Sequence, residues 1–510
     1  MTVAEAAPEA GATAAAQTDR EPAAMGVRSA AIWSMGGQYI SFAVQFASSV
    51  IISRLFLTPA EVGLFSIGLA AALLVSILQD FGLYRYISAL PRLERAEVER
   101  CSSVALLFSL AIAVIIAAAA WPMARAYAQP GLAPILLVIA ASYLFVPLSV
   151  VPLALMARNL QFRGHFMVNV GGAVAQGSVA LSLAAAGWSA MALAWATLAA
   201  ALARGLIAQW HRPAPPWPLR LGGVAEVLHF GSRSSALYLT GALGTRSPDL
   251  IVGKLLSLAA VGLYSRASSL ADQLRVLVAG AIGGVFFPAF ARLRDRGEPL
   301  GPAYLRVCAG YTGVLWPSMA ALALAAEPIV RSLYGEQWLG AVPLLQRIAL
   351  LELFVVTLPL HIDLPILAGR IHRLMALNLV DTLLSVSLLA LGCWLGGVEG
   401  AASSRLVYGA CWIALYARFM HQVVGFDVRA LLGIHLRSAV ATLAALAPMA
   451  LAYRFWLPPE RMGLVPLAVV SALGILAWLA TLWLVRHPLR EEIRHMAQRI
   501  LPAAGRLLPA

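Results

Sequence analysis

Residues 103–122 read SVALLFSLAIAVIIAAAAWP and carry no charged side chain over twenty consecutive positions. A helix rises 1.5 Å per residue, so a run of this length covers the roughly 30 Å hydrocarbon layer of a bilayer. Inside lipid the backbone must satisfy its own hydrogen bonds, and a continuous apolar run does so as a helix. The stretch therefore predicts a transmembrane helix.

Similar apolar runs recur along most of the chain. Its 510 residues are 61% hydrophobic and 12% charged, against roughly 45–50% and about 25% in soluble proteins. This composition predicts an all-α integral membrane protein with about fourteen transmembrane helices. We expect these spans near residues 30–52, 61–79, 103–122, 132–156, 167–187, 190–209, 229–252, 267–290, 307–326, 342–368, 374–394, 401–420, 435–455 and 463–484. The connections are too short for a soluble catalytic domain, so we expect no enzyme.

The basic residues indicate the orientation. Alternate connections, with both tails, hold 24 of the 37 arginines and lysines, and the remaining connections hold 6. Basic residues gather in cytoplasmic loops, so both termini are expected in the cytoplasm. The same rule explains the net charge of +13, and nucleic acid is rejected as a partner.

The span positions divide the chain into an ordered series of parts. Two parallel six-helix lobes are expected, followed by two further helices. The expected parts are a disordered cytoplasmic tail (1–28), an N-terminal lobe (29–210), a cytoplasmic linker (211–228), a C-terminal lobe (229–421), spans 13 and 14 (422–485) and a cytoplasmic tail (486–510).

Two stretches six spans apart repeat each other. Residues 54–66 read RLFLTPAEVGLFS and residues 254–265 read KLLSLAAVGLYS, which match with one gap. In the first copy Thr58, Pro59 and Glu61 fit a capping box at a helix start. A second, weaker repeat pairs Pro134, Ile139 and Leu144-Phe145-Val146 with Pro343, Ile348 and Leu353-Phe354-Val355. Parallel repeats related by an axis normal to the membrane are typical of alternating-access transporters.

Four short motifs, spread over most of the chain, suggest a family. They are LTPAEVGLF (57–65), ARNLQFR (157–163), IVGKLL leading to GLYSRA (251–267) and LYGEQW (333–338). In order and spacing they resemble the oligosaccharide flippases, the Wzx-type polysaccharide exporters of the multidrug/oligosaccharidyl-lipid/polysaccharide exporter superfamily.

The resemblance implies fourteen helices in two lobes around a central cationic cavity. It implies translocation of an undecaprenyl-diphosphate-linked oligosaccharide from the cytoplasmic to the periplasmic leaflet by alternating access. The partners would be this lipid-linked oligosaccharide, membrane lipid, and a polysaccharide polymerase and glycosyltransferases that make and use the substrate. No cofactor or metal is expected.

Ionisable residues inside spans are costly and usually face a cavity or a partner. Arg246 with Asp249 and Asp272 with Arg275 are spaced i,i+3, so each pair shares a helix face. Arg246 and Arg275 are the first candidates for the diphosphate, and the alternative is that both pairs are structural salt bridges between spans 7 and 8. The wider set of candidate cavity residues is Arg233, Lys254, Arg266, Gln38 and Gln45.

Four further residues could take up protons and couple transport to a gradient. They are Glu352, His361, Asp363 and Asp381, in spans 10 and 11. The alternative is that Pro359 and Pro365 break span 10 and these side chains satisfy the freed backbone groups.

Three other functions are compatible with a membrane protein of many helices. A multidrug exporter of the same superfamily would favour an acidic cavity, whereas the charge within the expected spans is mostly Arg. A peptidoglycan-precursor flippase would carry a similar lipid diphosphate. A membrane polysaccharide polymerase or ligase would need a large outer loop, and the longest outer connection is too short.

Overall fold

The computed structural model of the chain describes residues 27–76, 83, 87, 94–214, 219–220, 241, 243–244, 246–283 and 286–500, and within these ranges the regular structure is helical. Most of the expected seventh span lies outside the described residues. Its end, residues 246–255, is helical.

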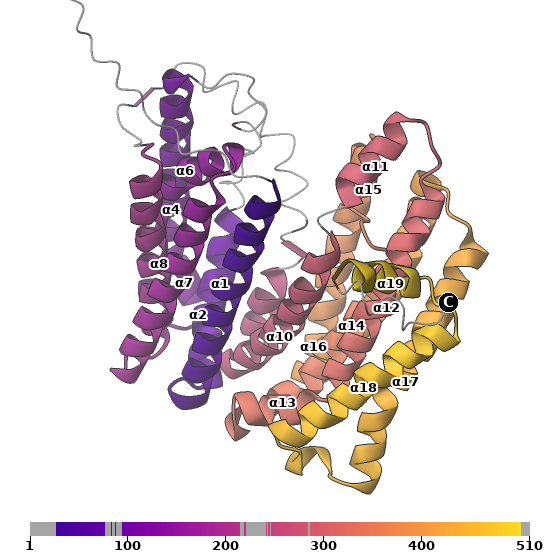
Figure 1. The fold of residues 1–510 in the computed structure, drawn as a ribbon. Helices are drawn as coiled ribbons and strands as arrows, with labels where there is room; N and C mark the ends of the chain where they lie inside the picture. Colours follow the sequence, from indigo (N-terminus) through magenta and orange to yellow (C-terminus); the bar gives the residue numbers. More distant parts are fainter. Residues whose placement is uncertain are drawn as a thin grey trace, which may run out of the picture.

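The first seven described helices form one group, called here the N-terminal bundle (Figure 1). Its helices are α1 (Val27–Leu55), α2 (Pro59–Ser76), α4 (Arg95–Ala126), α5 (Leu132–Tyr143), α6 (Pro147–Arg158), α7 (Phe162–Ala185) and α8 (Ala190–His211).

The remaining helices, with residues 246–256, form the C-terminal bundle (Figure 1). They are α10 (Leu258–Gly283), α11 (Phe286–Asp295), α12 (Gly301–Leu324), α13 (Ala326–Leu333), η2 (Glu336–Ala341), α14 (Val342–Val355), α15 (Asp363–Leu367), α16 (Ile371–Val424), α17 (Val428–Phe455), η3 (Pro459–Arg461), α18 (Leu464–Leu484) and α19 (Leu489–Ile500). The last of these lies inside the stretch expected as a plain tail.

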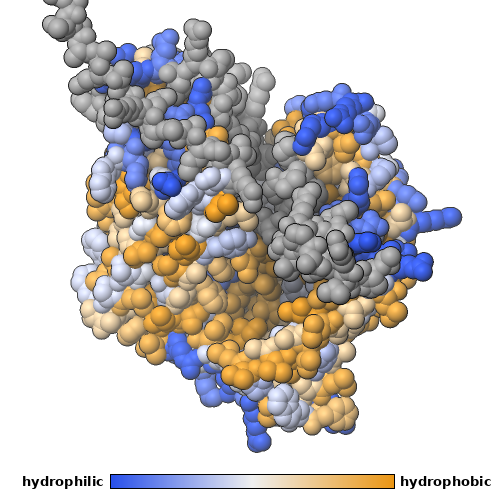
Figure 2. Space-filling view, in the orientation of Figure 1, coloured by the Kyte–Doolittle hydropathy of each residue, from blue (hydrophilic) through white to orange (hydrophobic). Residues whose placement is uncertain are grey.

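The helices are long and apolar enough for a membrane protein. Within the described ranges nine helices meet the length and composition of a span, or up to ten when α5 and α6, bent by 45°, are taken as one. The surface in Figure 2 is apolar over the body of the molecule, with hydrophilic side chains gathered toward its ends. The chain is an all-helical multi-pass membrane protein.

One expected span is interrupted. Span 10 is split, because α14 ends at Val355 and α15 begins at Asp363. Pro359 lies in this break, as the alternative for span 10 anticipated. Most of span 8 lies in α10, and residues 284–285, between α10 and α11, lie outside the described residues.

Spans 11 and 12 are the two halves of α16. The helix leaves helical geometry at Gly396 and Gly397, and Gly397 has a φ of 57°. Glycine adopts this left-handed conformation without the steric cost of a Cβ. The halves then run antiparallel, so that residues far apart in sequence come to face one another.

The start of α2 is fixed by the expected capping box. Glu61 Oε2 accepts from the Thr58 backbone N–H at 2.7 Å and from its hydroxyl at 2.9 Å. Ser189, just before α8, donates to the other carboxylate oxygen. The capping prediction is confirmed, and the cap also ties α2 to α8.

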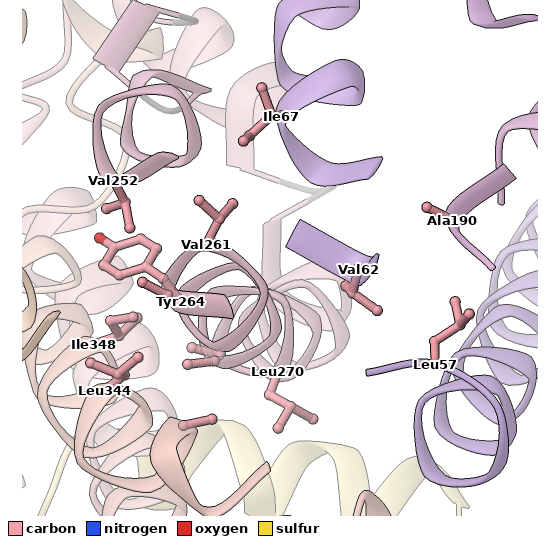
Figure 3. Close-up of a cluster of buried hydrophobic side chains, with 14 of the residues drawn as sticks. Leu57, Val62, Ile67, Ala190, Val252, Val261, Tyr264, Leu270, Leu344 and Ile348 are labelled. Atoms are coloured by element: carbon pink, nitrogen blue, oxygen red, sulfur yellow. The ribbon is translucent and has the colours of Figure 1, made fainter. Parts of the chain in front are cut away.

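The two bundles meet where α2 and α10 begin and lie farther apart toward α6 and α11 (Figure 1). One buried apolar cluster runs through both bundles at the meeting point. Figure 3 shows part of it, with Ile67 of α2 near Val261 of α10 and Tyr264 facing Ile348 of α14.

Candidate functional site: a polar cavity between the bundles

A cavity of about 720 Å³ lies between the two bundles. This size is in the range of small-molecule binding sites. Its walls come from α1, α2, residues 241, 244 and 246–249, α10, α14, residues 361–362 and α16. Figure 2 shows the hollow between the bundles on the face it displays.

The charged side chains described in the cavity wall all belong to the C-terminal bundle. They are Arg246, Asp249, Asp272, Arg275, Glu352, Asp381 and Arg405. The N-terminal bundle contributes an uncharged wall of Phe42, Ser66, Leu69, Ala70 and Leu73. Among the described residues, the charged side chains of the wall are therefore confined to one bundle.

Arg275 stands between two carboxylates. Its guanidinium lies 2.9 Å from Asp272 on its own helix, and its Nε lies 3.3 Å from Glu352 on α14. The Arg275 side chain keeps 40% of its surface exposed and that of Glu352 only 11%. Arg275 is thus held at the cavity wall with part of its charge open to a ligand.

The hairpin of α16 builds a second polar group. Arg405 donates to the Ser385 hydroxyl at 2.8 Å, and its guanidinium stacks 4.5 Å from the centre of the Tyr408 ring. The Tyr408 hydroxyl donates to Asp381 at 2.8 Å. A planar guanidinium held in this way has a fixed orientation and presents several N–H donors.

Aromatic rings continue the same wall. Trp412 and Tyr416 follow Tyr408 at four-residue spacing on the second half of α16, with ring centres 4.9 Å apart. His361 packs edge-on against both rings, at 4.9 and 5.3 Å. The Tyr416 hydroxyl is satisfied by Asn378 at 2.7 Å. Trp412 and Tyr416 are almost fully buried, so these rings support the wall by packing and expose little aromatic surface to the cavity.

The expectation of a cationic cavity needs correction. The described wall holds three guanidinium groups and four carboxylates, so fully ionised it is not positive. A carboxylate beside an arginine offsets part of the desolvation cost of both charges, as Asp272 and Glu352 do for Arg275. The described wall therefore carries charge of both signs.

The structure brings several candidate residues to the cavity. Its wall contains Arg246, Arg275, Asp249, Asp272, Glu352, His361 and Asp381. Their roles toward a diphosphate or a proton stay predictions. The alternative of salt bridges between spans 7 and 8 does not describe Arg275, whose ion pairs reach its own helix and α14.

Other candidates lie elsewhere. The structure corrects the expected position of Lys254, which donates to the carbonyl of Ala126 at the end of α4. It also corrects Arg266, which is stacked on Tyr334 and Trp338 and donates to Ser49. Both cations satisfy partners where the bundles meet and do not face the cavity.

Three of the remaining candidates do not line the cavity, and the fourth lies outside the described residues. Gln38 and Gln45 are exposed on α1, where Phe42 between them lines the cavity and they do not. Asp363 opens the short helix α15 outside the cavity wall. Arg233 lies outside the described residues.

Sequence reasoning missed Arg405 and the aromatic residues of α16. The signal was present, because Arg405 is a charge within an expected span and Tyr408, Trp412 and Tyr416 share one helix face. Their contacts with Ser385, Asp381 and Asn378 depend on the hairpin of α16, which spacing along one helix does not reveal.

The arrangement, an all-helical membrane protein with a polar cavity between two bundles, defines a transporter, and the comparisons with known proteins specify its family. A family model described as "Polysaccharide biosynthesis protein" matches residues 51–343. The match covers more than half of the chain, so the chain belongs to this family.

Two curated relatives carry corresponding names. The chain is 28% identical over 327 residues to the succinoglycan biosynthesis transport protein ExoT of Rhizobium meliloti (strain 1021), covering 62% of this chain and 64% of that one. It is 23% identical over 500 residues to the lipopolysaccharide biosynthesis protein WzxC of Escherichia coli (strain K12), covering 91% and 95%.

A solved structure shares the fold. The lipid II flippase MurJ in an inward closed conformation superposes with a TM-score of 0.68 at 12% identity, over 89% of this chain and 98% of that chain. The fold is therefore that of a known lipid flippase.

Proposed function

We propose that the protein translocates an undecaprenyl-diphosphate-linked oligosaccharide from the cytoplasmic to the periplasmic leaflet of the bacterial inner membrane, for polysaccharide export. It does so by alternating access, with fourteen spans and both termini in the cytoplasm, and makes no covalent bond. Glycosyltransferases make the substrate before transport, and a polysaccharide polymerase uses it afterwards. The relatives named for succinoglycan and lipopolysaccharide biosynthesis support this assignment.

One observation carries the proposal: Arg275 and Arg405 are held by neighbouring groups on one wall of the cavity, with Arg246 beside them. A diphosphate that leaves water needs charge-assisted hydrogen bonds to replace its hydration. Guanidinium groups supply these with planar, paired donors. Tyr408 of α16 lies against the guanidinium of Arg405 in the same wall and helps to fix its orientation.

The carboxylates provide a way to release the substrate after it has bound. When a diphosphate takes the guanidinium of Arg275, Glu352 loses its partner in a partly buried position. An unpaired buried carboxylate is costly unless it takes up a proton. Substrate binding then favours protonation of Glu352, and deprotonation favours substrate release.

The test is export in a strain that lacks the chromosomal copy. Arg246→Gln and Arg275→Gln are expressed from a plasmid and their amounts in the membrane are matched by immunoblot. Each should lower surface polysaccharide at least about tenfold, because a hydrogen bond to a charged group contributes about 1.5–3 kcal/mol. Lipid-linked oligosaccharide should accumulate inside the cell.

Arg347→Gln is the matched control. Arg347 pairs with the exposed Glu399 at 3.3 Å, away from the cavity, so export should stay at the wild-type level. Undiminished export by the Arg246→Gln/Arg275→Gln double variant would remove the proposed role of these residues. Undiminished surface polysaccharide in the deletion strain would remove the function.

A multidrug exporter is the second candidate, and the four carboxylates of the cavity favour it. Carboxylates without a free guanidinium would attract an organic cation. Efflux of ethidium from cells that express the protein distinguishes the two functions. We expect no efflux above that of the empty vector, and efflux that Asp249→Asn abolishes would replace the flippase proposal.

A further inference from the structure

The repeated stretches contact each other directly where α2 and α10 begin. Gly63 packs on the carbonyl of Leu258, and Gly262 packs on the carbonyl of Pro59. These four residues occupy corresponding positions of the two copies. A side chain at either glycine would collide with backbone, so glycine is what lets α2 and α10 approach this closely.

The floor of the cavity lies on the same contact. The hydroxyl of Ser66 donates to that of Ser265 at 3.0 Å, again between corresponding positions, and both residues line the cavity. Beyond them the apolar cluster of Figure 3 fills the space between the bundles. The cavity is therefore closed on this side.

Arg54 and Lys254 form a further pair of corresponding contacts between the two bundles. Arg54, the first residue of one copy, donates to the carbonyl of Ser332 near the end of α13. Lys254, the first residue of the other copy, donates to the carbonyl of Ala126 at the end of α4. Helix ends leave carbonyls without intrahelical partners, and the helix dipole makes these ends negative. Each cation thus binds a helix end of the opposite bundle.

Aromatic donors form a second pair of cross-bundle bonds. The Tyr127 hydroxyl donates to the carbonyl of Leu250 at 3.0 Å. The indole of the buried Trp338 donates to the carbonyl of Ser53 at 2.9 Å. Tyr127 directly follows α4, and Trp338 lies in η2, after α13. Each side chain donates to a carbonyl near the end of the span that precedes one of the repeated stretches.

We propose that the duplicated stretches form a reciprocal outer latch, in which Arg54 and Lys254 hold the bundles together on the side away from the cytoplasm. The side is set by the alternation of basic residues, which places Arg54, Lys254 and Arg331 in outer connections. Opening the cavity outward requires both latches and the serine contact to separate. The two repeated stretches contribute equivalent contacts, because Arg54 and Lys254 occupy corresponding positions in them.

A reversible cross-link tests the serine contact. Ser66→Cys/Ser265→Cys places two thiols where hydroxyl oxygens lie 3.0 Å apart. Reconstituted in liposomes and oxidised, this variant should lose transport, and reduction should restore it. Each single cysteine variant is the control. Wild-type transport by the fully cross-linked protein would overturn the latch while leaving the proposed function intact.

The accessibility of a cysteine in the cavity tests the role of Arg54 and Lys254 without a transport assay. Ser269→Cys lines the cavity just inside the serine contact and is labelled from outside with a membrane-impermeant maleimide. Cells without this cysteine give the background from the four native thiols. Arg54→Gln and Lys254→Gln should each raise the labelling rate about two- to fivefold, and the double variant more.

Matched variants complete the test. Lys254→Arg keeps a cationic donor and should label as slowly as the parent. Arg331→Gln removes a cation of the same outer region whose ion pairs with Glu327 and Glu336 stay within one bundle, and it should also leave labelling unchanged. Equal labelling of the Arg54→Gln/Lys254→Gln double variant and the parent would overturn the proposal.

Discussion

The Nε of Arg275 lies 3.3 Å from a carboxylate oxygen of Glu352, and the two residues come from different helices, α10 and α14. The contact joins two helices of one bundle and leaves two fifths of the arginine side chain exposed toward the cavity. An anionic ligand would therefore compete with Glu352 for the same guanidinium.

Glu352→Gln tests this competition. Without the carboxylate, Arg275 keeps only Asp272 as an ionic partner, so substrate should bind more tightly and leave more slowly. We expect both the KM and the turnover rate of flipping to fall, by roughly three- to tenfold. Asp295→Asn, at an exposed ion pair, is the control. A raised KM would contradict the competition.

Arg405 should matter as much as Arg275. Arg405→Gln removes the guanidinium that stacks on Tyr408 and bonds Ser385, and export should fall about tenfold or more. Arg405→Lys should not restore it, because a lysine keeps the charge but not the planar, stacked fork. Full rescue by lysine would mean that charge alone is needed there.

The glycines of the repeat give a prediction on stability. Gly63→Ala and Gly262→Ala each place a methyl group against a backbone carbonyl of the other bundle. The helices must then separate, which should cost about 1–3 kcal/mol and lower the Tm in detergent. Gly433→Ala, with open space around it, should leave the Tm unchanged or raise it. Equal Tm values for all three variants would contradict the close contact.

His487 gives a prediction on pH. It is fully buried just after α18, where its Nδ1 accepts from the backbone of Leu489 and its Nε2 bonds Ser438 at 2.9 Å. Burial, with the nearby Arg437 charge, lowers the pKa of His487 to about 4. The unfolded state, with a pKa near 6.5, binds the proton first, so stability falls as the pH drops from about 6.5 toward 4.

The slope of that loss is at most about 1.4 kcal/mol per pH unit. Thermal unfolding in detergent between pH 4 and pH 7 measures it. The difference in Tm between the protein and His487→Gln should narrow toward low pH, because the variant has no imidazole to protonate. A difference independent of pH would show that His487 does not titrate in this way.

The sequence predicted the helices well because a helix in lipid depends on local composition. The apolar run 103–122 lies within α4, and the turn at Gly396–Gly397 falls between two expected spans. The bend between α5 and α6 was not predicted, although Pro147 opens α6 directly after it and proline is a usual cause of a sharp helix kink. The split of span 10 was anticipated only as an alternative, through Pro359 and Pro365.

The site was predicted in part for a related reason. Arg246 and Arg275 stand out as charges in apolar runs, and both line the cavity. Lys254 and Arg266 stand out in the same way, but a charge near a helix end can face a cavity or cap another helix. Only the contact between the repeats distinguishes these outcomes, and it links residues about 200 positions apart.

The most direct measurement is flipping by the purified full-length protein in liposomes. The substrate is lipid-linked oligosaccharide extracted from the deletion strain, and its transfer between leaflets is followed by protection from a membrane-impermeant oxidant of sugars. The account predicts transfer well above that of empty liposomes and at least about tenfold less for Arg275→Gln. Transfer equal to that of empty liposomes, or equal for the protein and the variant, would contradict it.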